Sequence, residues 1–212
     1  MEWYNPHNEF RWFGLQTLAI AESMERLAGV SEALEDHEVY LLSQRANRME
    51  CRMNTRELEI RELVNADEGL EQWKIKVRES FPMARTVLED EILPMLGLHA
   101  SLRQEEYDME EVVDKVITNA PELIAVHIHR RGRQWQQRNC RLEHSELLIN
   151  GAYLRSLAIT GPDPVEVRQL RQELGLSGYE NVSYLGVLKR ITGMVPMVKV
   201  PDLPPSGEVP YP

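Results

Sequence analysis

The sequence lacks the features that mark membrane proteins, secreted proteins and the common nucleotide-binding classes. No apolar run approaches the eighteen or so residues that a membrane-spanning helix needs. The N-terminal Met-Glu-Trp-Tyr-Asn-Pro has neither the basic start nor the apolar run of a signal peptide. There is no P-loop, no G-x-G-x-x-G and no G-x-S-x-G motif. We therefore expect a cytoplasmic protein that does not act at a membrane.

Cysteine is scarce, and basic residues are in the minority. Cys51 and Cys140 stand neither in a C-x-x-C motif nor beside a patterned histidine, so no cysteine metal site is predicted. In a chain expected in the cytoplasm, two reduced and packed thiols are favoured over a disulfide. The 24 Lys and Arg residues against 34 Asp and Glu residues give a net charge of −10, which argues against general nucleic-acid binding.

What the chain does contain is enough apolar material for one globular domain. Of the 212 residues, 42% are hydrophobic and 27% are charged. We predict one domain over 1–194 and a separate tail over 195–212. The tail holds six of the twelve prolines, which excludes a packed helix or a central strand there. Two interpretations stay open for it, namely a tail without fixed structure or an extended arm that docks on a protein partner.

Alternating apolar and polar residues fill most of the domain, with helical spacing in between. Turns are expected at Asn54-Thr55 and Gly132-Arg133, and N-caps at Asp108 and Asp163. The predicted strands cover 9–14, 38–43, 48–53, 57–64, 72–78, 123–131, 137–149 and 153–160. The predicted helices cover 20–28, 83–97, 108–118, 163–175 and 181–192. This order predicts an α+β fold, an antiparallel β-barrel or tunnel with peripheral helices.

The charged residues of several predicted strands share one face, because successive side chains of a strand point to opposite sides. These faces lean basic although the chain is acidic overall, and the acidic residues gather in the predicted helices. A basic concave face within an acidic exterior would concentrate a small polyanion. Two-layered sheets with one solvent-facing side show a similar alternation, so that simpler interpretation stays open.

The order of the segments resembles the CYTH superfamily of triphosphate-tunnel proteins, which includes thiamine triphosphatases, inorganic triphosphatases and class IV adenylate cyclases. Glu9-Phe-Arg-Trp-Phe stands where that family carries its ExExK strand, and Trp73-Lys-Ile-Lys resembles the strand with the family's lysine. Ser156-Leu-Ala-Ile-Thr-Gly, the following helix and Val182-Ser-Tyr-Leu-Gly-Val-Leu are similar to its EIEG strand, helix and closing S-Y-x-x-L-L helix. The resemblance covers roughly 8–192, with its most specific part in the C-terminal third.

The chain departs from this pattern at the family's metal-binding carboxylates. Arg11 and Phe13 replace the second Glu and the Lys of ExExK, and Ala158 and Thr160 replace the two glutamates of EIEG. Because Mg²⁺ needs hard oxygen ligands, the resemblance with these changes implies a site that binds an anion without hydrolysing it quickly. The residues assigned to the anion are Arg11, Arg52, Arg61, Lys74, Lys76, His127, His129, Arg131 and Arg141.

Three functions follow as alternatives. The first is an accessory or regulatory protein that binds a phosphorylated small molecule or polyphosphate with little or no catalysis. The second is a divergent triphosphatase that uses Mg²⁺ or Mn²⁺, with Glu9, Glu50, Glu59 and Glu143 as weak candidate metal ligands. The third is a subunit of a larger assembly that docks through residues 195–212. The first alternative names no cofactor, and no catalytic residue is assigned.

The strand faces generate a direct test. If Lys74 and Lys76 hold the anion, then Lys74→Ala combined with Lys76→Ala should abolish the thermal stabilisation by tripolyphosphate.

Overall fold

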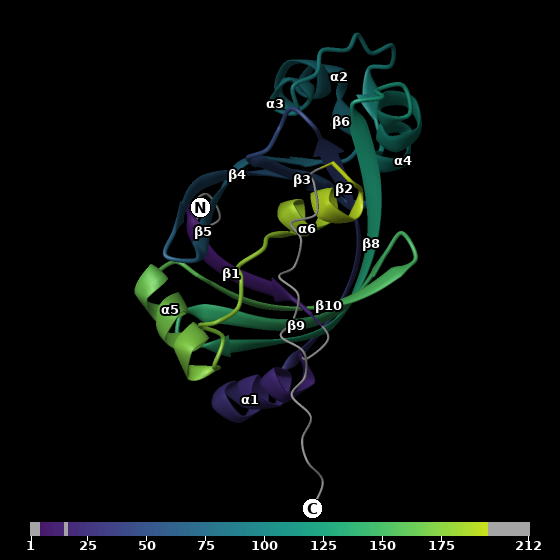
Figure 1. Ribbon diagram of the computed structural model, residues 1–212. Helices are drawn as coiled ribbons and strands as arrows, with labels where there is room; N and C mark the ends of the chain where they lie inside the picture. The colour runs from purple at the N-terminus through teal and green to yellow at the C-terminus, as the bar shows by residue number, and fades with distance from the viewer. Residues whose placement is uncertain (1–4, 15–16, 195–212) are drawn as a thin grey trace, which may run out of the picture.

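A closed eight-stranded antiparallel barrel forms the body of the protein (Figure 1). In this computed structural model the described residues are 5–14 and 17–194. The barrel strands are β1 (His7–Phe13), β2 (Glu32–Ser43), β3 (Met49–Met53), β4 (Glu57–Asp67), β5 (Leu70–Ser80), β8 (Leu123–Gln137), β9 (Cys140–Ile149) and β10 (Ala152–Gly161), in the spatial order β1-β10-β9-β8-β2-β3-β4-β5. The predicted α+β barrel is confirmed.

Helices and a small second sheet surround the barrel. A helical lobe between β5 and β8 contains β6 (Met83–Ala84), α2 (Arg85–Val87), η2 (Leu88–Ile92), α3 (Leu93–Met95), β7 (Glu106–Tyr107), α4 (Met109–Glu111) and η3 (Val112–Ile117), where η marks π-helix. The remaining helices are α1 (Leu18–Ala28), α5 (Pro164–Glu173) and α6 (Tyr184–Ile191). Among the described residues, no helix combines the length and apolar character needed to cross a membrane.

Local side-chain hydrogen bonds explain why several elements begin where the sequence predicts. Asn54 turns the chain between β3 and β4, because its Oδ1 accepts from the backbone N–H groups of residues 56 and 57 at 2.8 and 3.1 Å. Asp108 and Glu111 form a reciprocal capping box at the start of α4. Asp163 caps α5, with Pro164 in the first turn.

The turn predicted at Gly132-Arg133 is wrong, since β8 runs on to Gln137. Gly132 is needed for a close approach between strands instead. A Cβ atom at this position would lie 2.0 Å from the backbone oxygen of His144 on β9. The reversal occurs at 138–139, where Arg138 has a φ of 55° and β9 begins at Cys140.

Two apolar clusters lie on the outside of the barrel. One joins the outer faces of β2, β3 and β4 to the helical lobe, with Leu41, Ile60 and Leu88 among its buried members. The other lies between β1, β9 and β10 and the helices α1 and α5, with Phe10 and Ile159 at its centre. The helices seen around the ring in Figure 1 therefore cover much of its outer surface.

A third apolar cluster lies inside the ring, where α6 packs against inward-facing strand residues. Leu188 of α6 is fully buried there, together with Tyr40 and Val126 of the barrel wall. The segment before α6 reaches the interior between β1 and β5, whose pairing is limited to His7–Glu9. Beyond that point Asn181 Oδ1 accepts from the Arg11 N–H at 2.7 Å, and the Val182 N–H donates to the Arg11 carbonyl at 2.8 Å. This segment thus satisfies the strand edge that β5 leaves open.

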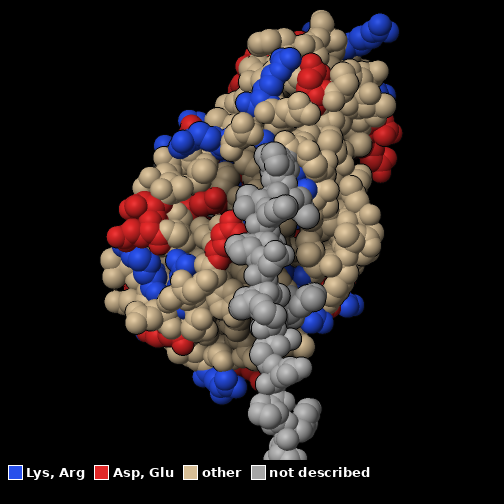
Figure 2. Space-filling view, viewed as in Figure 1, with Lys and Arg blue, Asp and Glu red and all other residues tan. Residues whose placement is uncertain are grey.

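Charges of both signs are interspersed over the outer face seen in Figure 2. Blue and red side chains neighbour each other there, outside the area under the grey atoms. On this face the basic residues form no single continuous patch.

The packing of α6 predicts a large difference between two residues of the same helix. Leu188→Ala should lower the free energy of unfolding by about 2–5 kcal/mol, because it opens a cavity beside Tyr40 and Val126. Ile191→Ala should change it by less than about 1 kcal/mol, since Ile191 is 43% exposed. Urea unfolding of both variants measures this. Equal losses would show that α6 does not pack as described.

Candidate functional site

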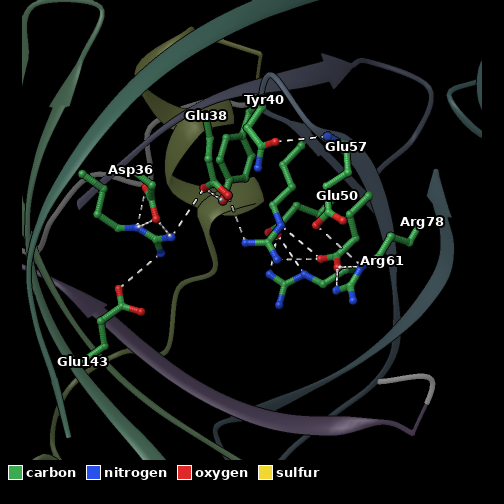
Figure 3. A network of polar contacts seen from close by, with 12 residues as sticks. Asp36, Glu38, Tyr40, Glu50, Glu57, Arg61, Arg78 and Glu143 are labelled. Atoms are coloured by element: carbon green, nitrogen blue, oxygen red, sulfur yellow. Dashed lines mark hydrogen bonds and ion pairs between the residues drawn. The ribbon is translucent and has the colours of Figure 1, made fainter. Parts of the chain in front are cut away.

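The barrel interior holds a continuous chain of alternating charges, and Figure 3 shows its part from Glu143 past Glu38 to Arg78 together with the pair of Arg61 and Glu50. Each member is buried or half-buried and points inward from a barrel strand. In order of contact this ion-pair chain consists of Glu50, Arg61, Glu9, Arg11, Glu143, Arg130, Glu38, Arg52, Glu59 and Arg78. Because isolated buried charges are very costly, the alternation is what makes so many ionisable groups tolerable in one interior.

One half of the chain follows β1, β4 and β3. Arg61 Nε lies 3.0 Å from Glu50 Oε1, and its Nη1 lies 3.6 Å from Glu9 Oε2. Arg11 then joins Glu9, with Nε 3.1 Å from Oε1, to Glu143, with Nη1 3.1 Å from Oε1. The guanidinium of Arg11 also lies 4.4 Å from the ring centre of Tyr184 on α6. The helix inside the barrel therefore contacts this half of the chain at Arg11.

The other half leads from β9 to the opposite wall. Arg130 Nη1 lies 3.6 Å from Glu143 Oε1, and its Nη2 lies 3.7 Å from Glu38 Oε2. Arg52 connects Glu38 to Glu59, with nitrogen–oxygen distances of 3.3 and 2.7 Å. Arg78 ends the chain on Glu59, its Nε 3.0 Å from Oε2. Asp36 adds a further carboxylate on Arg130.

The arginines keep the central carboxylates ionised. Burial alone would raise the pKa of Glu143, but the charges of Arg11, Arg130 and Arg141 hold that pKa far below its usual value. Burial likewise raises the pKa of Glu9, but the charges of Arg11 and Arg61 lower it by more, so the pKa of Glu9 is also below its usual value. Glu9 and Glu143 are thus negatively charged at neutral pH.

Glu71 on β5 behaves in the opposite way. Burial and the negative charge of its cross-strand partner Glu9 raise the pKa of Glu71 to about 7, although hydrogen bonds from Trp73 and Ser183 oppose the rise. Trp73 Nε1 donates to Glu71 Oε2 at 3.2 Å. Glu71 therefore changes its charge near neutral pH, next to the residue that caps α6.

A cavity of about 340 Å³ opens where the ion-pair chain reaches one end of the barrel. We call it the mouth cavity. Its charged lining consists of Arg52, Arg61, Arg78, Arg141 and the single carboxylate Glu59. Arg141 forms no ion pair with any residue in 5–14 or 17–194. Desolvation and the nearby charges of Arg11 and Arg130 lower its pKa. The mouth cavity thus has a surplus of positive charge.

Four of the nine predicted anion-binding residues point into the barrel. Arg52, Arg61 and Arg141 line the mouth cavity, and Arg11 lies deeper in the ion-pair chain. Glu9, Glu50, Glu59 and Glu143, the weak metal candidates, also belong to that chain. Here the strand faces assigned from the sequence point inward as expected.

The other five predicted residues lie on the outside. Trp73 and Ile75 face the mouth cavity, so the alternating Lys74 and Lys76 point outward, and Lys76 Nζ pairs with Glu62 at 3.2 Å. On β8 the apolar residues of 124–128 pack inside against α6, which leaves three exposed outer residues, His127, His129 and Arg131. These three β8 residues point outward because α6 fills the interior beside this strand, and the side chains that face α6 are apolar.

Sequence reasoning missed Arg78, Arg130 and Glu38 as members of the interior. A register shift between Ile60 and Arg61 skips Lys76 in the pairing of β4 with β5, so Arg78 joins the inward side. Arg130 shares its strand face with the apolar Val126 and Ile128, and this face points inward. The sequence offers one signal for this position: Arg130 stands where the alternation of Val126 and Ile128 leads one to expect an apolar residue, and a charge at such a position is typical of a paired interior residue.

The carboxylates present do not fit a divalent metal ion. Each glutamate of the ion-pair chain already accepts from one or more arginines. Among the atoms of the ion-pair chain, Glu50 Oε2 alone is buried with no hydrogen-bond partner in the described residues. Within that part of the chain, no group of three or more His, Cys, Asp or Glu residues could hold a metal ion. A Mg²⁺ ion would therefore have to displace arginines from their carboxylates.

Comparisons with known proteins identify the fold. No protein-family model matches the sequence, and no curated protein matches it either. Among solved structures, a conserved hypothetical protein from Pyrococcus furiosus is 13% identical, with a TM-score of 0.52 over 84% of this chain and 98% of that one. A Pyrococcus horikoshii protein is 14% identical, with a TM-score of 0.50 over 84% and 97%.

This barrel has the triphosphate-tunnel fold. The fold predicted from the resemblance is thereby confirmed. A further similar structure is the triphosphatase of the Mimivirus capping enzyme, at 8% identity and a TM-score of 0.44 over 82% of this chain and 88% of that one. At such identities the likeness concerns the fold, and the chemistry of this tunnel depends on its own residues.

Glu143 is the residue on which the two halves of the tunnel's ion-pair chain meet. Glu143→Gln should lower the free energy of unfolding at pH 7 by roughly 3–5 kcal/mol, because it leaves Arg11 and Arg130 buried with too little negative charge. The lowered pKa means that this stabilisation is complete above the unfolded value near 4.5 and is lost as the pH falls. Unfolding by urea between pH 3 and 7 measures both effects.

Glu62→Gln is the matched control, because Glu62 is a partly exposed partner of Lys76 on the outer surface. Its loss should cost less than about 1 kcal/mol. Equal costs for the two variants would contradict a dominant interior chain.

Glu71 predicts the reverse pH dependence. Between the unfolded value near 4.5 and about 7, the folded protein holds a proton on Glu71 that the unfolded chain has lost. The stability contributed by this group therefore declines as the pH rises through that window. Glu71→Gln should remove the decline, so the variant should gain stability relative to the wild type from pH 5 to pH 8. Parallel stability curves over this range would refute the assignment.

Proposed function

We propose that this protein binds a phosphate-rich anion in the mouth cavity of its tunnel and does not hydrolyse it quickly. The observation that carries the proposal is the surplus of arginine there, four guanidinium groups against one carboxylate. Arginine suits phosphate because its planar fork donates two parallel hydrogen bonds and keeps its charge at all relevant pH values. An accessory or regulatory role fits a binding protein of this kind.

The ion-pair chain supports this proposal by fixing the arginines before a ligand arrives. Arg52 and Arg78 are both held by Glu59, and Arg61 is held by Glu50. Side chains already ordered lose little conformational entropy on binding. Arg141 is the exception, since no carboxylate of the described residues lies within ion-pair distance of it and a phosphate oxygen could take that place.

The same contacts weigh against the alternative of a metal-dependent triphosphatase. Glu9, Glu50, Glu59 and Glu143 all neutralise arginines, and Ala158 and Thr160 replace the carboxylates of the resembled motif. We derive no hydrolytic step for this tunnel. The interaction alternative rests on residues 195–212, which lie outside the described residues, and it stays a prediction.

Calorimetric titration of the full chain with tripolyphosphate, pyrophosphate and ATP, without and with Mg²⁺, tests the proposed function. Tripolyphosphate should bind without metal. Arg141→Ala should weaken its binding roughly 10- to 100-fold, which corresponds to the loss of one or two charge-assisted hydrogen bonds. This substitution leaves no carboxylate orphaned, because Arg141 has no described ion-pair partner.

Lys74→Ala with Lys76→Ala is the matched control. These two cations lie on the outer surface of the same barrel, so the affinity should stay within about twofold. This reverses the expectation from the sequence. Unchanged binding in Arg141→Ala would refute the mouth cavity as the site, and rapid Mg²⁺-dependent phosphate release would favour the triphosphatase.

A further inference from the structure

A second and larger cavity lies in the helical lobe, away from the interior of the barrel. Its volume is about 790 Å³, and we call it the lobe cavity. It is bounded by η3, by the irregular chain over 98–104 and by the loop between β2 and β3. None of its lining residues belongs to the ion-pair chain or the mouth cavity. Any ligand here would therefore be independent of the tunnel.

The floor of the lobe cavity is apolar. Leu93, Leu98, Tyr107 and Val116 line it and are buried in the cluster that joins the lobe to the barrel. A volume of this size, with an apolar floor and a few polar groups at its edge, is typical of sites for small molecules. The floor thus favours a ligand with an apolar body.

The rim of the cavity is basic in a chain of net charge −10. It carries Arg45, Arg103 and Lys115 against the single acid Glu122, which lies 3.6 Å from Arg45. Arg103 is exposed and has no ion pair with any residue of the described ranges. The rim therefore favours a negatively charged group on the ligand.

Two features hold the wall of the cavity in shape. The Tyr107 hydroxyl accepts from the backbone N–H groups of Arg103 and Gln104, both at 2.9 Å, which fixes the chain over 98–104. Lys115 Nζ lies 2.6 Å from Glu111 and also donates to Gln104 across the cavity edge. The segment Val112–Ile117 that carries Lys115 and Val116 is π-helical, a geometry that is rare and often found at functional sites.

We infer that the lobe cavity binds a small amphipathic anion, an apolar body with a carboxylate or phosphate head. The body packs on Leu93, Leu98 and Val116, and the head lies between Arg103 and Arg45 at the rim. Such a ligand would be recognised separately from the polyanion of the mouth cavity, because the two sites differ in the character of their floors.

The fluorescent anion 8-anilinonaphthalene-1-sulfonate, titrated into the full chain, tests the inference. We expect saturable binding at one site and its displacement by decanoate and by decyl phosphate, whereas neutral decanol should compete at least tenfold less well. Arg103→Glu should weaken binding of the probe at least tenfold. Because Arg103 is exposed and its hydrogen bond to Tyr107 uses the backbone, this variant should keep the wild-type circular dichroism spectrum.

Arg141→Ala is the control, since Arg141 lines the mouth cavity and does not line the lobe cavity. Probe affinity in this variant should equal that of the wild type. The inference fails if Arg103→Glu binds the probe normally, if decanol competes as well as decanoate, or if Arg141→Ala rather than Arg103→Glu loses the probe. Tripolyphosphate binding by Arg103→Glu reports separately on the tunnel, so failure of one site does not count against the other.

Discussion

The pairing of buried charges is the constraint on which the rest of this structure depends. Five arginines and five glutamates share one barrel interior, and none could be buried there without opposite charges on its neighbours. The alternation in turn requires the strands to keep their register, because a slip by one residue would turn each charge outward. The strand register, the order of the charges and the shape of the mouth cavity therefore depend on one another.

The same constraint separates this tunnel from a general basic pocket. Most of its arginines are already paired with glutamates, so the anion of the proposed function would bind where this pairing is incomplete, around Arg141. A ligand there would lie beside Arg52, Arg61 and Arg78, which belong to the ion-pair chain. In the proposed function, the affinity for the anion therefore depends more on Arg141, which has no ion pair among the described residues, than on the total number of arginines.

The sequence predicted the barrel and many element boundaries because these follow from local patterns. Asn54, Asp108 and Asp163 act within a few residues of their own position, and the period-two alternation is local as well. The direction of a strand face is not local. Lys74 and Lys76 point outward because of a register shift with β4, and the outer position of His127 depends on α6, a helix more than fifty residues later. Those long-range contacts decide which of the two alternating sets of side chains in a strand faces inward. The sequence of the strand alone does not determine this.

The way the barrel closes also governs the order in which it can form. β1 pairs with β10 through Asn8 and Gly161, and the backbone of Arg11 is completed by Asn181 and Val182. Contacts between segments so far apart in the chain carry a high entropic cost of loop closure and slow the folding of β-rich proteins. During synthesis, β1 can pair with β5 early, but its hydrogen bonds to β10 and to residues 181 and 182 must wait for nearly all of the domain. Until β9 is made, Arg11 lacks Glu143, so the two halves of the ion-pair chain that meet on this glutamate cannot be joined.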